Sequence, residues 1–508
     1  MSFALPILFY TPFVFIFLYL LVNFIVKTPR HVCIVVLGDI GRSPRMLYHA
    51  LSFAQEGFKV YLVGYKGSVP PKKLVENENI ELHYVTEAPN FFKYYPKIFQ
   101  YFLKVIWQSL ALSWTLLLLP KMGSYFLQNP PSIPTMAVAY VVSRVRCSEL
   151  VIDWHNYGHT ILAMALKSGH PMVRFAEQYE KICGRLSAYN ICVTKAMKKD
   201  LQQNWNIKAT TVYDRPPENF CSVSPEEQHE LFVRLAREYP VFADRSGNEE
   251  STVFTQRSSS GEIVSLDKRP ALLVSSTSWT EDEDFGILLE ALKDYDLREA
   301  VPNLICVITG KGPQKEFYSK QIKERQWEKV QFCLPWLAAE DYPLLLGSAD
   351  IGVCLHMSSS GLDLPMKVVD MFGCGLPVCA VKFECIDELV KHDVNGLIFR
   401  DSSELLTQLQ DLLGGFPSNQ GKLSTFRKNL ELFQSVRWHD QWKQLVLPIF
   451  EEIGATQKPS QFRVQTGSGI PENFDDIGSE DGENSGNVHP SSAGESGTGA
   501  AQEGKKER

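Results

Sequence analysis

A glycine-containing turn is the first segment of the sequence whose residue types could bind a substrate. The segment GDIGRSPR, at residues 38–45, follows an apolar run. Gly38 and Gly41 allow a tight turn, and the start of a following helix presents unpaired N–H groups to an anion. Arg42 and Arg45 add positive charge. We therefore predict a diphosphate-binding turn. The pattern is not the G-x-G-x-x-G of dinucleotide-binding enzymes, which argues against a dehydrogenase.

Three polar residues of the first half could accept a proton. Asp39 stands at the carboxyl end of a predicted strand, where open α/β sheets bind ligands, and it is either a helix cap or a general base. Asp153 and His155 belong to a second polar segment, IDWHNYGHT, which also follows an apolar run. Histidine accepts protons near neutral pH, but a structural hydrogen bond between these two residues explains the pair equally well. No serine elbow accompanies them, so the sequence gives little support for a hydrolase.

Two segments of the second half could hold phosphates. The segment ITGKGP, at residues 308–313, places glycines between an apolar strand and a helix, and Lys311 there either pairs with a phosphate or is a solvated loop lysine. In SSSGLDLPMKVVD, the residues Asp363, Lys367 and Asp370 are spaced i, i+4 and i+7, so they would share one face of a helix. A lysine for phosphates and a carboxylate for ribose hydroxyls suit a sugar nucleotide. A surface ion-pair face is the alternative.

These polar segments need strands to position them, and the sequence contains two series of strand-like runs. Short β-branched apolar runs alternate with segments of helix length, a pattern typical of βαβ units and of a parallel sheet with helices on both faces. The pattern restarts at Arg269, which predicts an α/β protein with two Rossmann-like domains in series. The predicted strands are 31–37, 59–64, 80–85, 124–128, 150–153 and 189–194 in the first series, and 271–276, 303–310, 330–334, 350–355 and 377–381 in the second.

Three segments lie outside this pattern. The polar stretch 226–268 predicts a helix followed by a mobile loop. The segment 438–453 is amphipathic and predicts a helix that closes the fold. From about residue 455 the chain is rich in Gly, Ser, Glu and Asn and poor in large apolar residues. Such a composition cannot bury enough apolar surface to offset the entropy of the chain, so it predicts a disordered tail.

The N-terminal segment predicts a transmembrane anchor. Residues 1–26 contain no charged residue, and about 20 apolar residues suffice to span a bilayer. The segment lacks the basic start and the cleavage site of a signal peptide. Lys27 and Arg30 follow it, so the positive-inside rule places the N-terminus in the lumen and the rest of the chain in the cytosol. A buried core helix is the alternative.

A second apolar segment, 91–119, combines aromatic residues and leucines with Lys93, Lys97 and Lys104. Two interpretations are open. The segment is either a helix packed in the core or a helix at the membrane interface, with its lysines on lipid phosphates. A second membrane span is disfavoured, because it would separate the two Rossmann-like domains on opposite sides of the bilayer.

Composition excludes several classes of protein. Lys and Arg total 51 against 58 Asp and Glu in the 508 residues, a net charge of −7, which argues against non-specific nucleic-acid binding. The eleven cysteines form no CxxC pair and no Cys/His cluster. We therefore expect reduced thiols in a cytosolic environment, and neither a disulfide framework nor a zinc site.

At the phosphate-binding segments the sequence resembles the GT-B glycosyltransferases. The resemblance implies two Rossmann-like domains facing a cleft, with the donor nucleotide in the C-terminal domain and the acceptor in the N-terminal one. Many of these enzymes carry a Glu-x7-Glu element followed by a CGLPV-like turn. This sequence keeps CGLPV at 374–378, and Asp370 stands where the second, ribose-binding Glu belongs. The first Glu is absent, and SSSGLD stands in its place.

Five motifs together resemble one family, the chitobiosyldiphosphodolichol β-mannosyltransferases, over about residues 1–455: GDIGRSPR, IDWHNYG, SSTSWTEDEDF, ITGKGP and DLPMKVVDMFGCGLPV. The resemblance implies transfer of mannose from GDP-mannose to GlcNAc2-diphosphate-dolichol on the cytosolic face of the endoplasmic reticulum. A β-1,4 bond made from an α-linked donor implies inversion. The chain is then divided into an anchor at 1–27, an acceptor domain at 28–210, a donor domain at 211–437, a closing helix at 438–454 and a tail at 455–508.

The resemblance also suggests roles for single residues. We hypothesise Asp39 as the first-choice base, with Asp153 or His155 as alternatives. Basic side chains, and no protein-bound metal, are expected to stabilise the departing GDP; a divalent cation could stimulate turnover, and no tightly bound cofactor is expected. Other mannosyltransferases of the pathway are potential partners. The expected donor contacts are Lys311, Gly312, Gly361, Lys367 and Asp370, and the expected acceptor contacts are Gly38, Gly41, Arg42 and Arg45. The alternatives are a GT-B enzyme with another sugar nucleotide or acceptor, and a non-catalytic GT-B scaffold.

Overall fold

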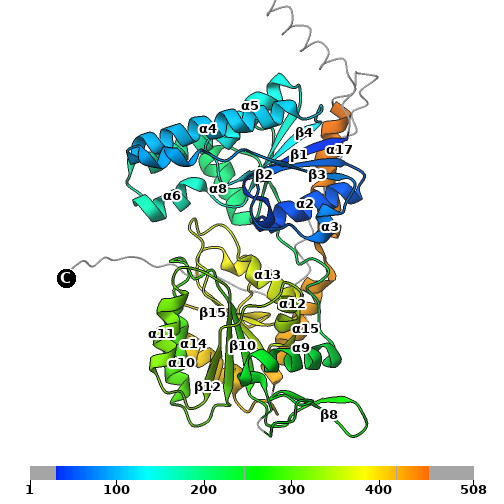
Figure 1. Cartoon of the computed structure of the whole chain (residues 1–508), viewed down its shortest axis with the longest axis vertical. Coiled ribbons are helices and arrows are strands. Elements are labelled where there is room, and N and C mark those ends of the chain that lie inside the picture. The colour runs from blue at the N-terminus through cyan, green and yellow to red at the C-terminus, as the bar shows by residue number, and fades with distance from the viewer. Residues whose placement is uncertain (1–29, 245, 419, 457–508) are drawn as a thin grey trace, which may run out of the picture. The chain divides into compact units, whose positions relative to one another are not determined.

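The computed structural model of the chain describes residues 30–456 except 245 and 419 (Figure 1). The predicted anchor and almost all of the predicted tail lie outside these residues. Within them, two parallel sheets follow one another along the chain, as the two series of apolar runs predict. All eleven cysteines lie in the described part and have free thiols.

The first sheet has seven parallel strands in the order β3-β2-β1-β4-β5-β6-β7. The strand order reverses between β1 and β4, and open α/β sheets bind ligands beyond the carboxyl ends of the strands at such a point. The strands are β1 His31–Asp39, β2 Lys59–Tyr65, β3 Ile80–Tyr84, β4 Ser124–Asn129, β5 Glu149–Trp154, β6 Tyr189–Cys192 and β7 Thr210–Thr211.

Alternate residues of β1 pack on opposite faces of this sheet. Ile34 is completely buried against α2 (Pro44–Gln55) and the last two helices of the described chain. Its neighbour Val35 is completely buried on the other face, among residues of α4 (Lys97–Leu118), α5 (Thr135–Val145) and α8 (Lys195–Trp205). A strand with apolar side chains on both faces belongs inside a parallel sheet covered on both sides.

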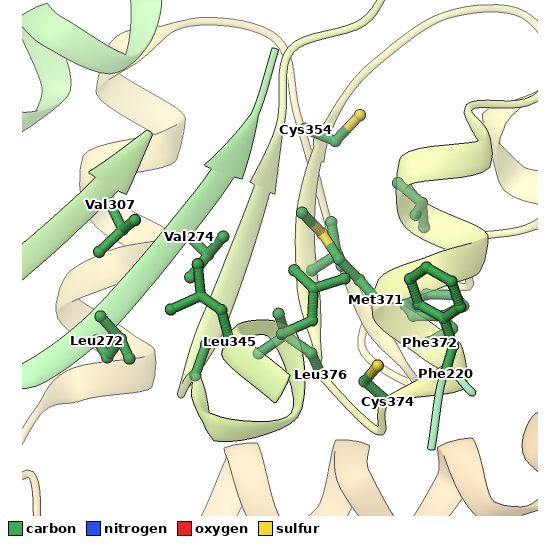
Figure 2. Close-up of a cluster of buried hydrophobic side chains, with 14 of the residues drawn as sticks. Phe220, Leu272, Val274, Val307, Leu345, Cys354, Met371, Phe372, Cys374 and Leu376 are labelled. Atoms are coloured by element: carbon green, nitrogen blue, oxygen red, sulfur yellow. The ribbon is translucent and has the colours of Figure 1, made fainter. Parts of the chain in front are cut away.

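The second sheet has six parallel strands in the order β12-β11-β10-β13-β14-β15, and its order reverses between β10 and β13. Figure 2 shows part of its core, where Leu272 and Val274 of β10 lie in one cluster with Met371 and Phe372 of α13 (Met366–Gly373). The strands are β10 Ala271–Ser276, β11 Leu304–Thr309, β12 Val330–Cys333, β13 Ile351–Cys354, β14 Val378–Val381 and β15 Gly396–Phe399.

The remaining helices connect and cover these strands. They are η1 Ile40–Arg42, α3 Lys72–Val75, η2 Asn90–Tyr94, α6 Gly158–Leu166, α7 Pro171–Arg185, α9 Pro225–Glu238, η3 Pro240–Phe242, α10 Phe285–Asp296, α11 Lys315–Glu324, α12 Asp341–Ser348, η4 Ile386–Glu388, α14 Ser402–Leu413, α15 Gly421–Ser435, α16 Trp438–Leu445 and α17 Leu447–Thr456.

Two connecting segments differ from their predictions. The helix predicted in 226–268 is α9, but the predicted loop contains an antiparallel hairpin of β8 (Thr255–Arg257) and β9 (Ile263–Ser265). The closing segment forms two helices, α16 and α17, and not one. Pro448 explains the break, since proline lacks the N–H that a continuous helix would need there.

The apolar segment 91–119 forms η2 and α4. One side of α4 packs in the core, as the first interpretation predicts, and the other side is exposed, as a helix at the membrane interface would require. Leu112 and Leu116 are completely buried against the first sheet. On the other side, Leu110 and Trp114 are 64% and 68% exposed. α4 is also long and apolar enough to cross a membrane by length and composition.

Candidate active site

The predicted site residues lie at the carboxyl ends of the strands in both sheets. In the first sheet, Asp39 ends β1, and Asp153 near the end of β5 is followed by His155. In the second sheet, Lys311 follows β11, and Lys367 lies on α13 after β13. The two sets therefore occupy the edges where ligands bind in parallel α/β sheets.

The side chain of Asp39 caps the short helix η1. Its carboxylate accepts hydrogen bonds from the backbone N–H groups of Gly41 and Ser68 and from the Ser68 hydroxyl, at 2.8–3.0 Å. Burial alone would raise the pKa of Asp39, but the hydrogen bonds from Ser68 and Gly41 and the nearby Arg42 charge lower it below its ordinary value. A carboxylate with a lowered pKa is a weaker proton acceptor, so the structure favours the capping role over the predicted first-choice base.

The turn after β1 requires glycine at position 41. A Cβ atom there would lie 2.4 Å from the carbonyl oxygen of Ser68, far inside van der Waals contact. Gly38 lies within β1 and has room for a side chain. Arg42 remains at the surface, with its side chain 80% exposed and its Nε donating to Ser68 Oγ at 3.0 Å. Of the two predicted arginines, Arg42 is thus the one that can reach an anion directly.

Arg45 lies elsewhere than the prediction placed it. It is 2% exposed, and its guanidinium donates to both carboxylate oxygens of Asp153 at 2.8 and 3.1 Å and to Asp214 at 2.7 Å. A guanidinium that is buried and paired in this way cannot extend toward an acceptor diphosphate. The physical reason is that Arg45 stands on the inner side of α2, facing the sheet.

Removal of the Arg45 guanidinium is expected to destabilise the fold strongly. Arg45→Ala leaves the completely buried Asp153 carboxylate without its main countercharge, which typically costs about 3–5 kcal/mol. Urea unfolding of the full chain measures this loss. Arg42→Ala is the matched control, because an exposed arginine contributes roughly 0–1 kcal/mol. Equal stability of the two variants would contradict the assignment of Arg45 as a buried structural cation.

Asp153 is also unsuited to the base role that the sequence left open for it. Burial alone would raise its pKa, but Arg45 and His155 together hold the pKa well below the ordinary range. His49 Nε2 lies 3.2 Å from the same carboxylate. Burial lowers the pKa of His49 to about 4, so this histidine is neutral at physiological pH. Asp153 is therefore a permanently ionised group that orients its neighbours.

His155 is the member of this cluster that reaches the surface. Its Nε2 lies 2.8 Å from Asp153 Oδ2, and its side chain is 21% exposed. A carboxylate that accepts from Nε2–H leaves the lone pair of a neutral imidazole on Nδ1. The pair has the arrangement in which a buried aspartate fixes the tautomer of a catalytic histidine. Of the three predicted candidates, His155 is therefore the best placed to accept a proton.

The other histidine of this segment is structural. His159 Nδ1 lies 2.7 Å from the buried carboxylate of Glu180, which also accepts from the backbone N–H of Gly158 at 2.7 Å. Glu180 lies on α7 and caps the start of α6. No signal in the sequence pointed to Glu180 as this partner, because it stands about 20 residues further along the chain.

In the second domain, Glu283 of the loop after β10 pairs with Lys367, one of the lysines predicted to bind phosphate. Glu283 is 3% exposed, forms an ion pair with Lys367, and accepts from the Thr277 hydroxyl and from the Ser278 N–H at 2.7 Å. The ammonium group has three N–H donors, so a lysine fixed by one carboxylate can still donate to another oxygen. Glu283 therefore positions Lys367.

A second cation of this region was not predicted from the sequence. His356 Nδ1 lies 3.1 Å from Asp282, and its Nε2 lies 3.8 Å from Asp363. Burial alone would lower the pKa of His356, but the two carboxylates raise it to about 9, so the imidazole is charged at neutral pH. Glu283 and His356 also form an antiparallel bridge, which places this cation beside the loop that holds Lys367.

The raised pKa of His356 predicts a pH-dependent stability. The folded state holds the proton more tightly, so the stabilisation is complete below the ordinary pKa of about 6.5 and is lost as the pH rises through about 9. The difference in unfolding free energy between the wild type and His356→Gln should shrink by roughly 2–3 kcal/mol between pH 6 and pH 10. Urea unfolding at both pH values measures it. A difference that stays constant or grows with pH would contradict a charged His356.

Lys311 lies on the exposed side of the ITGKGP loop. Its Nζ stands 3.5 Å from the centre of the Trp336 ring, a cation–π contact. The loop itself requires glycine, because a Cβ atom at Gly312 would lie 1.8 Å from the carbonyl oxygen of Ser278. The residue before Lys311, Gly310, has a φ of +121°. Gly312 thus packs on the segment 277–283, whose other end binds Lys367.

The predicted shared helical face is only partly present. α13 begins at Met366, so Lys367 and Asp370 lie on it, but Asp363 precedes it, and the prediction that all three share one helical face is wrong. Asp363 instead accepts from Asn156 Nδ2 at 2.8 Å and forms a hydrogen bond with Ser358. Asp363 lies outside α13 because Pro365 stands at the start of the helix, and the residue before a proline favours an extended conformation.

Asp370 and Gly361 are the two remaining predicted donor contacts. Burial and the nearby Asp214 carboxylate raise the pKa of Asp370 to about 8, so this carboxyl is mostly protonated at neutral pH. A protonated carboxyl can both donate and accept hydrogen bonds, and ribose hydroxyls can take part in either kind. Gly361 has a φ of +76°, and a Cβ atom there would lie 3.2 Å from the Glu384 side chain.

Two other features of the described residues bear on the site. They contain no group of three or more His, Cys, Asp or Glu side chains that could hold a metal ion. A surface pocket is lined by Asp244, Lys268, Asn303 and Lys329 among others. Asn303 and Lys329 directly precede β11 and β12, so this pocket lies at the amino ends of the strands, away from the candidate site.

Comparisons with known proteins find a glycosyltransferase family profile and relatives that are named as glycosyltransferases. The profile of the family "Glycosyl transferases group 1" matches residues 256–415, which include Lys311 and Lys367. The human chitobiosyldiphosphodolichol beta-mannosyltransferase is 52% identical over 439 residues, which cover 83% of this chain and 93% of the human protein. An Arabidopsis thaliana protein named UDP-glycosyltransferase TURAN is 45% identical over 453 residues, which cover 83% of this chain and 97% of that protein.

A solved structure shares the fold at low sequence identity. The crystal structure of Anabaena HepE in complex with UDP and glucose has a TM-score of 0.54 and 16% identity, and the match covers 84% of this chain and 99% of HepE. With two parallel Rossmann-like sheets and the group 1 domain, the chain is a glycosyltransferase with the GT-B fold. Because it is about half identical to the human protein over nearly all of that protein's length, it belongs to the chitobiosyldiphosphodolichol beta-mannosyltransferase family.

Proposed function

We propose that this enzyme transfers mannose from GDP-mannose to GlcNAc2-diphosphate-dolichol and forms a β-1,4 bond. The relation to the human enzyme, 52% identical over 93% of its length, carries the proposal. The enzyme would work on the cytosolic face of the endoplasmic reticulum, with the uncharged N-terminal segment as its anchor and the N-terminus in the lumen. Two groups of residues support the proposal chemically.

The first group is His155 with Asp153. A β product from an α-linked donor requires one displacement with inversion at the anomeric carbon. The bond from that carbon to the phosphate oxygen breaks, and its electron pair leaves with GDP. The 4-hydroxyl oxygen of the acceptor bonds to the carbon from the opposite side, and its proton passes to His155 Nδ1. Asp153, 2.8 Å from Nε2, stabilises the imidazolium that forms.

The second group consists of cations near the loop after β10. Departing GDP carries one more negative charge than the GDP part of the donor, so fixed positive charge accelerates departure. Lys367, positioned by Glu283, and the charged His356 are the buried or half-buried candidates, and Lys311 is the exposed one. In this proposal the protein's own cations replace a bound metal, and Asp370 contacts the ribose.

One relative favours a second candidate donor. The Arabidopsis protein is named a UDP-glycosyltransferase, and it is 45% identical to this chain. A UDP-sugar would place a uracil where the first proposal has a guanine, with the same diphosphate contacts. A donor panel that contains GDP-mannose, UDP-glucose and UDP-GlcNAc separates the two candidates.

The experiment that tests the function uses the purified full chain in detergent with labelled GDP-mannose and a chitobiosyl-diphosphate lipid. The expected product is sensitive to β-mannosidase, which would establish donor, acceptor and stereochemistry together. GDP-mannose binding without transfer would indicate a different acceptor. If neither GDP-mannose nor GDP binds, the proposal fails, and transfer from a UDP-sugar would support the second candidate.

A further inference from the structure

His49 is a buried histidine that the proposed mechanism does not use. It lies on α2, is completely buried, and packs edge-to-face against Phe126 of β4 and Trp438 of α16, with ring centres 4.7 and 4.9 Å apart. Close packing by these two rings leaves the imidazole one orientation. The contacts of its two nitrogens in that orientation indicate what the residue does.

Both ring nitrogens of His49 contact groups from other parts of the chain. Trp442 Nε1 of α16 donates to His49 Nδ1 at 2.9 Å, and His49 Nε2 lies 3.2 Å from Asp153 Oδ2. Burial lowers the pKa of His49 to about 4, so the imidazole is neutral and carries one N–H. Because Nδ1 accepts from the indole, that hydrogen is on Nε2, the nitrogen beside the carboxylate. No other acceptor of the described residues pairs with Nε2.

Asp153 Oδ2 is the atom at which His49 meets the candidate base. Arg45 Nε and His155 Nε2 both lie 2.8 Å from this oxygen, and His49 Nε2 lies 3.2 Å from it. Asp153 is completely buried, so protein groups and not a water shell fix its carboxylate. During turnover His155 would gain and lose a proton, whereas neutral His49 keeps the same N–H throughout. His49 can therefore hold Oδ2 in place in both protonation states of His155.

We propose that His49 is a positioning residue of the transferase, which holds Asp153 so that Oδ2 keeps the His155 ring in the orientation of a general base. This role rests on the proposed function, in which His155 accepts the proton of the acceptor. α16 takes part through Trp442, since the indole N–H selects the tautomer with the hydrogen on Nε2. A residue 393 positions further along the chain thereby contributes to the candidate site of the first domain.

Two amides that each imitate one nitrogen of the imidazole test this role. In His49→Gln the amide can place an N–H at the position of Nε2, next to Asp153, whereas in His49→Asn the shorter amide reaches only the position of Nδ1, next to Trp442. We expect His49→Gln to retain most of the wild-type kcat. His49→Asn should lose a factor of about 10–100, because a small misplacement of a reacting group can cost about 10²-fold. The affinity for GDP should stay unchanged in both.

A double-mutant cycle with His155→Ala separates positioning from a general loss of structure. If His49 acts through His155, His49→Asn lowers kcat in the wild-type background and has no further effect in the His155→Ala background. Urea unfolding shows that each variant is folded under the assay conditions. The same factor of loss in both backgrounds would overturn the proposal. A lower kcat for His49→Gln than for His49→Asn would also overturn it and would assign His49 to anchoring α16.

A second readout needs no donor. Diethyl pyrocarbonate acylates a neutral imidazole at a nitrogen lone pair, and mass spectrometry gives the rate at His155, whose side chain is 21% exposed. The rate should fall several-fold in His49→Asn and be kept in His49→Gln, since Asp153 on Nε2 leaves the lone pair on Nδ1. Equal rates in the two variants would overturn the proposal. This rate pattern in a wild type that transfers no mannose would contradict only the proposed function.

Discussion

Replacing His155 by alanine is expected to lower kcat by about 10²–10⁴-fold, the usual contribution of a general base, while GDP binding stays almost unchanged. The expectation rests on the 2.8 Å contact with Asp153 and on the exposure of the imidazole. Turnover of GDP-mannose with the chitobiosyl lipid gives kcat, and calorimetric titration gives the affinity for GDP.

Asp39→Asn is the control for this experiment. Asparagine keeps a side-chain oxygen that can accept from Gly41 and Ser68, so the cap is largely preserved while the carboxylate is lost. We expect this variant to retain more than about a tenth of the wild-type rate, because a cap takes no proton. The reverse result, with Asp39→Asn inactive and His155→Ala active, would assign the base to Asp39. Asp153→Asn is not diagnostic, since it also removes the partner of Arg45.

Lys367→Ala is expected to lower kcat by roughly 10²–10³-fold, as the loss of one fixed group that stabilises developing charge usually does. The lost charge acts more strongly on GDP than on GDP-mannose, because GDP carries the additional negative charge. The affinity for GDP should therefore fall by a larger factor than the affinity for GDP-mannose. Binding of both nucleotides, measured by titration, separates this effect from a general loss of donor binding.

The matched control is Lys320→Ala, which removes an equal charge from α11, where the side chain is 76% exposed and 3.7 Å from Glu324. This variant should keep the wild-type rate. An intermediate result is expected for Lys367→Arg, because a planar guanidinium keeps the charge but cannot reproduce the geometry of the ammonium beside Glu283. Equal losses of affinity for GDP and GDP-mannose in Lys367→Ala would contradict a role in GDP departure.

The strands in the centres of both sheets could be predicted because they are apolar on both faces. The run 271–276, for example, has the bounds of β10. β7 and β15 were not predicted. β7 has only two residues, and the apolar run of β15 is only the three residues 397–399, between Gly396 and Arg400. The hairpin of β8 and β9 has mostly polar residues that face solvent, so its sequence resembles a loop.

The glycine-containing loops of the site could be predicted from the sequence, but the ion pairs and hydrogen bonds between its side chains could not. Glycine-containing segments after apolar strands mark the turns, and Gly41 and Gly312 both prove sterically necessary. The partner of Arg45 could not be predicted, because Asp153 lies 108 residues away and neither residue differs in type from a surface residue. His356 was missed for the same reason, since its charge depends on Asp282, which lies 74 residues before it.

The two closing helices have a consequence for how the protein folds as it is synthesised. Trp438 and Trp442 of α16 donate hydrogen bonds to Ser52 and His49 of α2, across 386 and 393 residues of sequence. Phe450 of α17 is buried in the same cluster beside β1. At 5–20 residues per second, a ribosome needs roughly 20–80 s to deliver these helices after α2 has emerged. During that interval the part of this face that α16 and α17 cover is exposed, so the N-terminal half cannot reach its final packing before the second sheet has been made.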